Sequence, residues 1–488
     1  MVRNDASTNG PGLRRLPSRV PGLDAVLGGG LMVGDTYLIA GTPGTGKTTL
    51  GNQLAFARAA MGSSVLFATL LTESHDRMLA HLEGFQFFDR ALVGERIHYL
   101  SLLGVLQEEG VEGVMHTVLT TVRSHQASLL IIDGAGVARM LTGSDFDYAR
   151  FIHGLQARTA LLGCTTLLLA GEREADPVAT HVDGVIQLAN EPAQARDARS
   201  LRVVKLRGSD YLNGRHRFAI GDAGITVFPR LEAAHARTEP TWHEPDERLT
   251  FGIPGLDTMT GGGLPAGSVT VVLGTPGAGK TLLGLHFLSE GASRGEPGLI
   301  ATFHETAAAL SSTAERAGMN LGSYLDTGLV RVLWRPPLEL APDEWAWQML
   351  AVIDEYRPRR LVIDAFSDLV PLFAVPERRI FFTPALAQQL RDRGVTTLIN
   401  MEIDTFAAPY LISPVQNVSA SVDNAVLLRT VELGSSLRRV VSILKERQTG
   451  FDPTIREFVI DPRGMVIGDR LDAGGLLTGS ATPLPDNA

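Results

Sequence analysis

The sequence predicts an α/β protein of two similar domains in tandem, each a mostly parallel sheet flanked by helices with a C-terminal antiparallel extension. Two observations lead to this fold class. Residues 20–50 and 253–283 align without a gap, with 17 identities in 31 positions at a constant offset of 233. In both copies, continuous apolar runs of strand length alternate with helix-like stretches, which is typical of a parallel sheet buried on both faces.

Later landmarks keep the same order in both copies, which indicates a duplicated domain rather than a short repeated motif. Asp133 and Asp364 differ by 231 positions, and Lys205 and Lys445 differ by 240. The segments outside the two copies are polar and lack an apolar period. We therefore predict a disordered N-terminal tail at 1–17, a first domain at 18–230, a linker at 231–248, a second domain at 249–467 and a flexible C-terminal tail at 468–488.

The elements follow in the same order within each copy. The first copy is expected to have strands at 37–40, 65–70, 129–133 and 166–170, and helices from Lys47 and near 75–82, 111–124 and 146–161. The second copy is expected to have the matching strands at 269–273, 299–303, 361–364 and 396–400. Shorter alternating runs predict closing antiparallel strands at 201–207 and 217–220, and at 438–445 and 457–460.

The composition excludes a chain that is disordered throughout, because 44% of the 488 residues are hydrophobic and 20% are charged. The net charge of −9 gives no global field that attracts nucleic acid, although a local basic groove is compatible with it. The longest apolar stretch, 159–170, is too short to span a bilayer, and the polar N-terminus does not resemble a signal peptide. The single cysteine, Cys164, cannot form an internal disulfide. We expect a soluble cytoplasmic protein.

Two glycine-rich loops predict nucleotide binding, because each lies between an apolar strand and a helix and satisfies G-x4-G-K-[ST]. Glycine lets backbone N–H groups turn towards phosphate oxygens at a helix N-terminus, where the dipole favours anions. The lysine adds a charge for the terminal phosphates. The predicted nucleotide-binding residues are Gly41, Thr42, Pro43, Gly44, Thr45, Gly46, Lys47, Thr48 and Thr49 in the first copy, and Gly274, Thr275, Pro276, Gly277, Ala278, Gly279, Lys280, Thr281 and Leu282 in the second.

A Mg²⁺ ion is expected beside each loop. The hydroxyls of Thr48 and Thr281 follow the lysines, and two apolar strands end in Asp133 and Asp364, at 86 and 84 residues after the respective lysine. An aspartate at that place can bind the metal through water, and Mg²⁺ keeps water and phosphate oxygens as its other ligands. The structural alternative is an aspartate that only ends a strand in a turn.

Glu73 and Glu305 are the candidate catalytic residues, since hydrolysis needs a group that orients or deprotonates water. Each lies just beyond the second apolar strand of its copy, 26 residues after Lys47 and 25 after Lys280. We expect that strand to neighbour the strand before the phosphate loop, which would bring the carboxylate beside the γ-phosphate. The alternative is an exposed acid that only stabilises a helix N-terminus.

With these loops, the PGLD and GGG segments, the strand-end aspartates and the late K-x-R elements, the chain resembles the RecA-like P-loop ATPases of the KaiC/RadA group. The resemblance covers most of residues 18–467, and the tandem arrangement is most similar to the KaiC family of circadian-clock ATPases and kinases. It implies two RecA-like P-loop NTPase domains, ATP and Mg²⁺ as cofactors, an ATP-dependent homo-hexameric ring and regulatory protein partners.

The resemblance also implies residues that reach the nucleotide of a neighbouring subunit. These are Lys205, Leu206 and Arg207 in the first copy, and Arg439, Lys445, Glu446, Arg447 and Thr449 in the second. Cations there can stabilise charge that develops on the phosphoryl group. The alternative is a solvated strand edge, which charged residues also protect from aggregation.

The chain departs from the KaiC pattern at positions linked to kinase activity. The family has two adjacent glutamates where this chain has Thr72-Glu73 and His304-Glu305. The family's Ser-Thr phosphorylation pair falls on Ser419-Ala420, so a serine autokinase activity at Ser419 is compatible with the sequence but a two-site cycle is not. A surface serine without a role is the alternative.

Three functions are compatible with these residues. The first is a ring-forming, KaiC-like ATPase that regulates partner proteins. The second is a RecA/RadA-type, DNA-dependent ATPase, which the acidic net charge and the absence of a basic run at 134–147 disfavour. The third is a nucleotide-gated scaffold in which ATP holds the ring together while turnover is slow.

Overall fold

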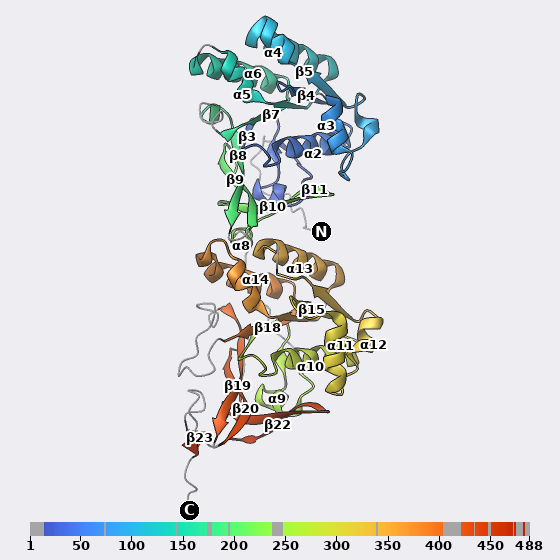
Figure 1. The fold of residues 1–488 in the computed structure, drawn as a ribbon, viewed down its shortest axis with the longest axis vertical. Helices are drawn as coiled ribbons and strands as arrows, with labels where there is room; N and C mark the ends of the chain where they lie inside the picture. Colours follow the sequence, from blue (N-terminus) through green and yellow to red (C-terminus); the bar gives the residue numbers. More distant parts are fainter. Residues whose placement is uncertain are drawn as a thin grey trace, which may run out of the picture. The chain divides into compact units, whose positions relative to one another are not determined.

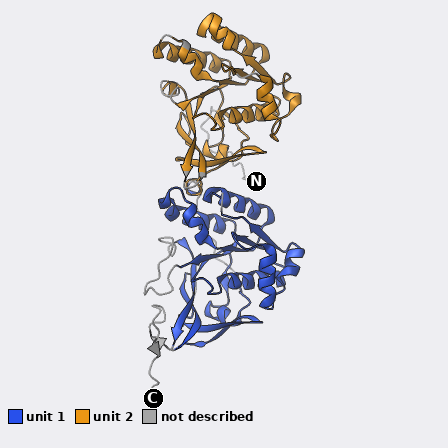
Figure 2. Ribbon diagram, in the orientation of Figure 1, with its two compact units in different colours: residues 1, 235–488 blue, residues 2–234 orange. Residues whose placement is uncertain are grey.

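A computed structural model describes residues 14–72, 75–142, 144–172, 178–193, 196–236, 247–337, 340–403, 421–433, 435–447, 450–471, 473–474 and 482–483. The chain divides into two compact units, residues 2–234 and residues 235–488 with residue 1 (Figure 2). Each unit is an α/β domain with one large sheet between helices (Figure 1), so the predicted fold class is confirmed.

The sheet of the first domain has nine strands among the described residues, in the order β11-β10-β9-β8-β3-β7-β6-β4-β5. The strands from β8 to β5 in this order pair in parallel, and β9, β10 and β11 continue the sheet in antiparallel fashion. Their bounds are β3 Thr36–Ala40, β4 Val65–Thr69, β5 Ile97–Ser101, β6 Leu129–Asp133, β7 Thr165–Ala170, β8 Gly184–Ala193, β9 Arg196–Leu206, β10 His216–Gly221 and β11 Gly224–Phe228.

Helices cover both faces of this sheet because its strands are apolar on both sides (Figure 1). Alternate residues of β3 show this: Tyr37 and Ile39 pack with α2 and α3, whereas Leu38 and Ala40 pack with α4, α5 and α6. The helices are α1 Leu23–Val26, α2 Lys47–Ala59, α3 His75–Leu82, α4 Leu103–His125, α5 Ala135–Leu141, α6 Asp145–Leu161 and α8 Leu231–His235, with a 3₁₀ turn at Arg90–Leu92. A kink at Gly110 divides α4, and its second part begins where the helix at 111–124 was predicted.

The second domain repeats this architecture, with the strand order β16-β15-β17-β18-β14-β19-β20-β21-β22 among the described residues. Parallel pairing runs from β16 to β19, and β20, β21 and β22 are antiparallel. The strands are β14 Val269–Gly274, β15 Gly298–Thr302, β16 Val330–Trp334, β17 Arg360–Asp364, β18 Thr396–Glu402, β19 Asn424–Leu433, β20 Ser436–Glu446, β21 Arg456–Asp461 and β22 Gly464–Arg470. The helices are α9 Pro254–Met259, α10 Lys280–Ser293, α11 Ala307–Arg316, α12 Leu321–Asp326, α13 Pro342–Tyr356 and α14 Arg379–Asp392, with 3₁₀ turns at Phe366–Leu372 and Pro376–Arg378.

Short two-stranded ladders lie outside the large sheets. A ladder precedes the phosphate loop in each domain, formed by β1 and β2 in the first and by β12 and β13 in the second. Another pairs β23 with β24 after the second domain. Their bounds are β1 Arg15–Leu16, β2 Leu31–Met32, β12 Arg248–Leu249, β13 Leu264–Pro265, β23 Ala473–Gly474 and β24 Thr482–Pro483.

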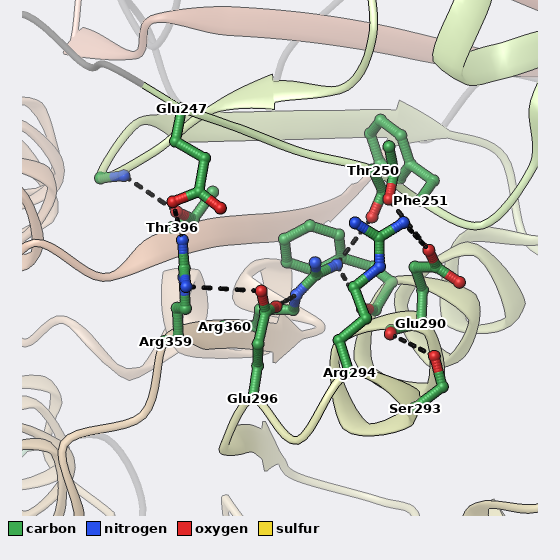
Figure 3. Close-up of polar contacts among 12 residues, drawn as sticks. Glu247, Thr250, Phe251, Glu290, Ser293, Arg294, Glu296, Arg359, Arg360 and Thr396 are labelled. Carbon is green, nitrogen blue, oxygen red and sulfur yellow. Dashed lines mark hydrogen bonds and ion pairs between the residues drawn. The ribbon is translucent and has the colours of Figure 1, made fainter.

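A buried arginine anchors the segment that leads into the second domain (Figure 3). The guanidinium of Arg360, on β17, donates to Glu296 Oε2 at 2.6 Å and to the carbonyl oxygens of Thr250 at 2.7 Å and Phe287 at 2.9 Å. Its carbon Cζ lies 4.6 Å from the centre of the Phe287 ring. Gly291 of α10 makes room for it, since a Cβ there would lie 2.3 Å from Arg360 Nε. The arginine therefore joins β17, α10 and the segment that follows β12.

Candidate active site

The first phosphate loop follows β3 and ends where α2 begins at Lys47. Gly46 has φ 97°, a left-handed conformation that glycine adopts without steric cost. Gly41 leaves no space for a side chain, because a Cβ would lie 2.4 Å from the Leu188 carbonyl oxygen. Lys47 Nζ donates to the carbonyl oxygens of Gly41 at 2.7 Å and Thr42 at 3.0 Å, which folds the lysine back over the loop. The predicted loop residues thus form one cradle at a helix N-terminus.

The second loop has the same construction between β14 and α10. Gly279 has φ 100°, and Lys280 Nζ donates to the carbonyl oxygens of Gly274 and Thr275, each at 2.9 Å. Lys280 is only 8% exposed. Burial lowers the pKa of this lysine, whereas the carboxylates of Glu402 and Asp364 raise it.

The predicted magnesium ligands meet in the first domain. Thr48 Oγ1 donates to Asp133 Oδ2 at 2.7 Å, across the 85 residues that separate them. In the second domain Asp364 ends β17 in the same way, but no hydrogen bond joins it to Thr281 among the described residues. Two protein ligands of this kind fit Mg²⁺, which takes few protein oxygens and completes its shell with water and phosphate oxygens. Within the described parts of the chain, no group of three or more His, Cys, Asp or Glu is placed to hold a metal by itself.

The expected position of the catalytic strand is wrong. Strands β4 and β15 do not neighbour β3 and β14, because β7 and β6 lie between in the first domain and β18 and β17 in the second. After the phosphate-loop strand the chain passes two strand positions before it forms the next strand, and later strands fill the positions between. The apolar pattern along the sequence does not reveal this order. Each strand instead pairs with the one that ends in the aspartate: Thr69 lies opposite Asp133, and Thr302 opposite Asp364.

This arrangement still brings Glu305 to the second site. Its backbone N–H donates to Thr302 Oγ1 at 3.3 Å, and its Oε2 is buried without a hydrogen-bond partner among the described residues. Burial and the neighbouring Asp364 carboxylate raise the pKa of Glu305, and His304 lowers it. His304 Nε2 lies 3.3 Å from Asp368 Oδ2. Glu73, the corresponding residue of the first domain, lies outside the described residues.

The two K-x-R elements, Lys205 to Arg207 and Lys445 to Arg447, lie at the end of the strands away from the phosphate loop. Lys205 pairs with Val185 near the start of β8, and its Nζ donates to the carbonyl oxygens of Ala179 at 3.1 Å and Thr180 at 3.0 Å. Arg207 is largely exposed, and one of its nitrogens lies 3.4 Å from Asp183 Oδ1. Leu206 is buried in the sheet.

In the second domain Lys445 and Arg447 lie at the end of the strands away from the phosphate loop, whereas Arg439 pairs with Thr430, beyond the level of Gly274 and so at the loop end. Lys445 Nζ donates to the Val422 carbonyl oxygen at 2.7 Å, and Arg439 and Arg447 are exposed. The Glu446 side chain is only 1% exposed and is paired with Arg248 of the same domain. The Glu446 side chain therefore turns inward, and its contact with a neighbouring nucleotide stays a prediction. Thr449 and the candidate phosphosite Ser419 lie outside the described residues.

Two polar residues that the motifs did not indicate lie on the strand beside the second phosphate loop. Asn400 and Glu402 both belong to β18, whose last residues lie beside the phosphate loop. Asn400 is fully buried, and neither its Oδ1 nor its Nδ2 has a hydrogen-bond partner among the described residues. An acid that ends an apolar strand is the signal by which Glu402 could have been found, as Asp364 was.

Comparison with known proteins identifies the family. A family model described as "ATPase: KaiC" matches residues 16–232 and 249–472, which together form most of the chain. The chain belongs to the KaiC family of ATPases. Each of the two matched regions of this chain contains one of the phosphate loops.

Curated relatives of nearly the same length carry the KaiC name. The chain is 26% identical to the "Circadian clock oscillator protein KaiC" of Rippkaea orientalis over 472 residues, which are 94% of this chain and 89% of the relative. It is 28% identical to the protein of the same name from a Picosynechococcus species over 487 residues, or 96% and 93% of the two chains. It is 26% identical to the "Circadian clock protein KaiC3" of a Synechocystis species over 506 residues, or 96% and 95%. Among the described residues, no helix combines the length and apolar character needed to cross a membrane.

Proposed function

We propose that this KaiC-family ATPase hydrolyses ATP with Mg²⁺ at sites that form between neighbouring copies in a homo-hexameric ring. The observation that carries the proposal is the position of the basic elements. In the first domain β3 runs from Tyr37, beside the start of β8, to the phosphate loop at Gly41, about 13 Å along the strand at ~3.3 Å per residue. Lys205 lies beside the start of β8 and Arg207 follows it, so they cannot reach the nucleotide of their own domain. A second copy would supply them.

The site residues then fall into four groups with different roles in the reaction. Lys47 and Lys280 would bind the terminal phosphates, and Thr48, Asp133, Thr281 and Asp364 would hold the metal ion. Mg²⁺, when bound, neutralises charge on the phosphates. Glu305, and by repeat Glu73, would orient the attacking water and accept its proton. Arg207 and Arg447 from the neighbouring copy would stabilise the charge that develops on the phosphoryl group.

Ring formation and hydrolysis are tested separately. We expect the chain to change from a small species to a ring on addition of ATP and Mg²⁺, measured by light scattering after size exclusion. A chain that stays monomeric in both conditions contradicts the ring. Glu305→Gln should lose hydrolysis at the second site while ATP binding persists, because the amide cannot accept a proton. Unchanged turnover in Glu73→Gln, Glu305→Gln and the double variant would refute the catalytic assignment.

Two further properties follow from the family and need their own measurements. The ring would regulate protein partners in the cytoplasm. The measurement is binding of a partner to the ring that depends on ATP. Autophosphorylation of Ser419 requires transfer of label from γ-labelled ATP to the wild type and its loss in Ser419→Ala. Salt-sensitive binding of single-stranded DNA at low ionic strength would favour a DNA-dependent ATPase instead.

A further inference from the structure

The two phosphate sites differ in the strand that lies beside the loop. Leu398, Asn400 and Glu402 alternate along β18 and therefore share one face of the sheet. This is the face that α10 covers, because Leu398 belongs to the same buried cluster as Leu283 and Leu285. At the same offset of 231, the first domain has Leu169 and Gly171 in place of the polar pair. The position of Glu402 is therefore a glycine in the first domain, and the nearest acid, Glu172, follows it and accepts from Gln187 instead.

The backbone register places Glu402 at the loop. In the parallel ladder Glu402 lies opposite Gly274, the first residue of the phosphate loop, and the next N–H, of Ile403, donates to the Gly274 carbonyl oxygen at 3.2 Å. The same carbonyl oxygen accepts from Lys280 Nζ. The Glu402 N–H donates to Ser367 Oγ at 2.7 Å, which holds the end of β18 in place.

Lys280 thus faces two carboxylates. Both Glu402 and Asp364 raise the pKa of the lysine and so act on it as negative charges. The lysine is buried, and electrostatic interactions are weakly screened in such a place. Asp364 has a use for its charge, because it ends the strand where the metal ion would be held. Glu402 ends a different strand, β18, and is not one of the predicted metal ligands.

We propose that Glu402 weakens the binding of nucleoside triphosphate at the second site and thereby sets the affinities of the two domains apart. This inference rests on the proposed function. Glu402 partly cancels the charge of Lys280 and repels the terminal phosphate, which carries the most charge and lies closest to the lysine. Because Mg²⁺ neutralises that phosphate, the effect of Glu402 is larger without the metal. It is also larger for ATP than for ADP.

Binding measured at one site at a time tests this inference. The Lys47→Ala variant disables the first loop, and ATP binding to its second site is followed by isothermal titration with and without Glu402→Gln. We expect Glu402→Gln to lower the Kd for ATP roughly tenfold in Mg²⁺, which corresponds to about 1.4 kcal/mol, and more in EDTA. The Kd for ADP should fall by less.

Matched controls remove the effects of net charge and misfolding. Glu172→Gln removes a carboxylate after β7 of the first domain, where Glu172 Oε1 accepts from Gln187, and should leave the second site unchanged. Gly171→Glu in a Lys280→Ala background should weaken ATP binding at the first site, and Glu402→Gly should repeat the effect of Glu402→Gln. Circular dichroism confirms that each variant is folded.

The outcomes separate the inference from the proposed function. Tighter ATP binding in Glu402→Gln, with no change in Glu172→Gln, supports the role of Glu402. Unchanged or weaker ATP binding in Glu402→Gln overturns it, because Glu402 then serves only to hold Lys280. Absence of ATP binding in the wild type and in both single-loop variants contradicts the proposed function itself.

Discussion

The substitution Gly291→Ala is expected to destabilise the second domain strongly, although alanine is the better helix former. In an exposed helix the change would stabilise by about 1 kcal/mol. Gly291 instead faces Arg360, and the new Cβ would lie 2.3 Å from Nε and 2.4 Å from Cδ of that side chain. The contact involves Cδ and Nε rather than the terminal nitrogens, so the whole guanidinium must move.

The cost follows from what the displaced guanidinium leaves behind. Arg360 is 1% exposed, and its loss leaves the Glu296 carboxylate and the carbonyl oxygens of Thr250 and Phe287 without this donor (Figure 3). Breaking a buried charge pair by moving one partner costs about 3–5 kcal/mol. After the gain in helix propensity, we expect a net loss of about 2–4 kcal/mol.

Tryptophan fluorescence in urea measures this loss for the second domain alone, because all four tryptophans lie at residue 242 or later. Trp345 is fully buried against Phe303, with ring centres 5.5 Å apart, and so reports on the core. With an m-value of about 2 kcal/mol/M, the midpoint should fall by about 1–2 M. In the double variant with Arg360→Leu, the alanine should add little to the effect of Arg360→Leu alone. A midpoint in Gly291→Ala equal to or above that of the wild type would refute the reasoning.

Three further predictions follow from burial and charge. Met465 N–H donates to His286 Nε2 at 3.0 Å, and burial lowers the pKa of His286, so the contribution of this histidine to stability is complete above about pH 6.5 and is lost as the pH falls. The urea midpoint of the second domain should therefore drop in acid more in the wild type than in His286→Gln. Glutamine is the residue at the matching position of the first domain, where Gln53 accepts from a backbone N–H in the same way. Burial and the adjacent strand-end carboxylate raise the pKa of Glu305, so the second-site hydrolysis rate should fall with decreasing pH earlier than for an ordinary glutamate; a pH–rate profile of the Lys47→Ala variant whose acid limb lies in the usual carboxylate range would contradict this. Burial raises the pKa of the Cys164 thiol to about 12, so a thiol reagent should label it only as the first domain unfolds in urea, and rapid labelling of the native protein would show that the site opens.

Much of the fold could be predicted because the repeated strands are short apolar runs. The predicted strand at 129–133 has the bounds of β6, and the predicted helix at 75–82 has those of α3. The strands that were missed include β5 and β19, in which His98 and Arg429 interrupt the apolar pattern. Such strands obtain their pairing from neighbours in the sheet, so context rather than composition decides them.

The chain by itself determined the two α/β domains, the two phosphate loops and the carboxylates that end their strands, because these depend on local spacing and backbone chemistry. Only the tertiary structure decided which strands lie side by side. The crossovers separate β15 from β14 by two strands, and the register of β18 brings Glu402 to Lys280 across 122 residues. The fold also turned Glu446 inward to Arg248 and placed Lys205 at the end of the strands away from its own loop. These relations arise from long-range pairing, which a periodic pattern along one segment does not encode.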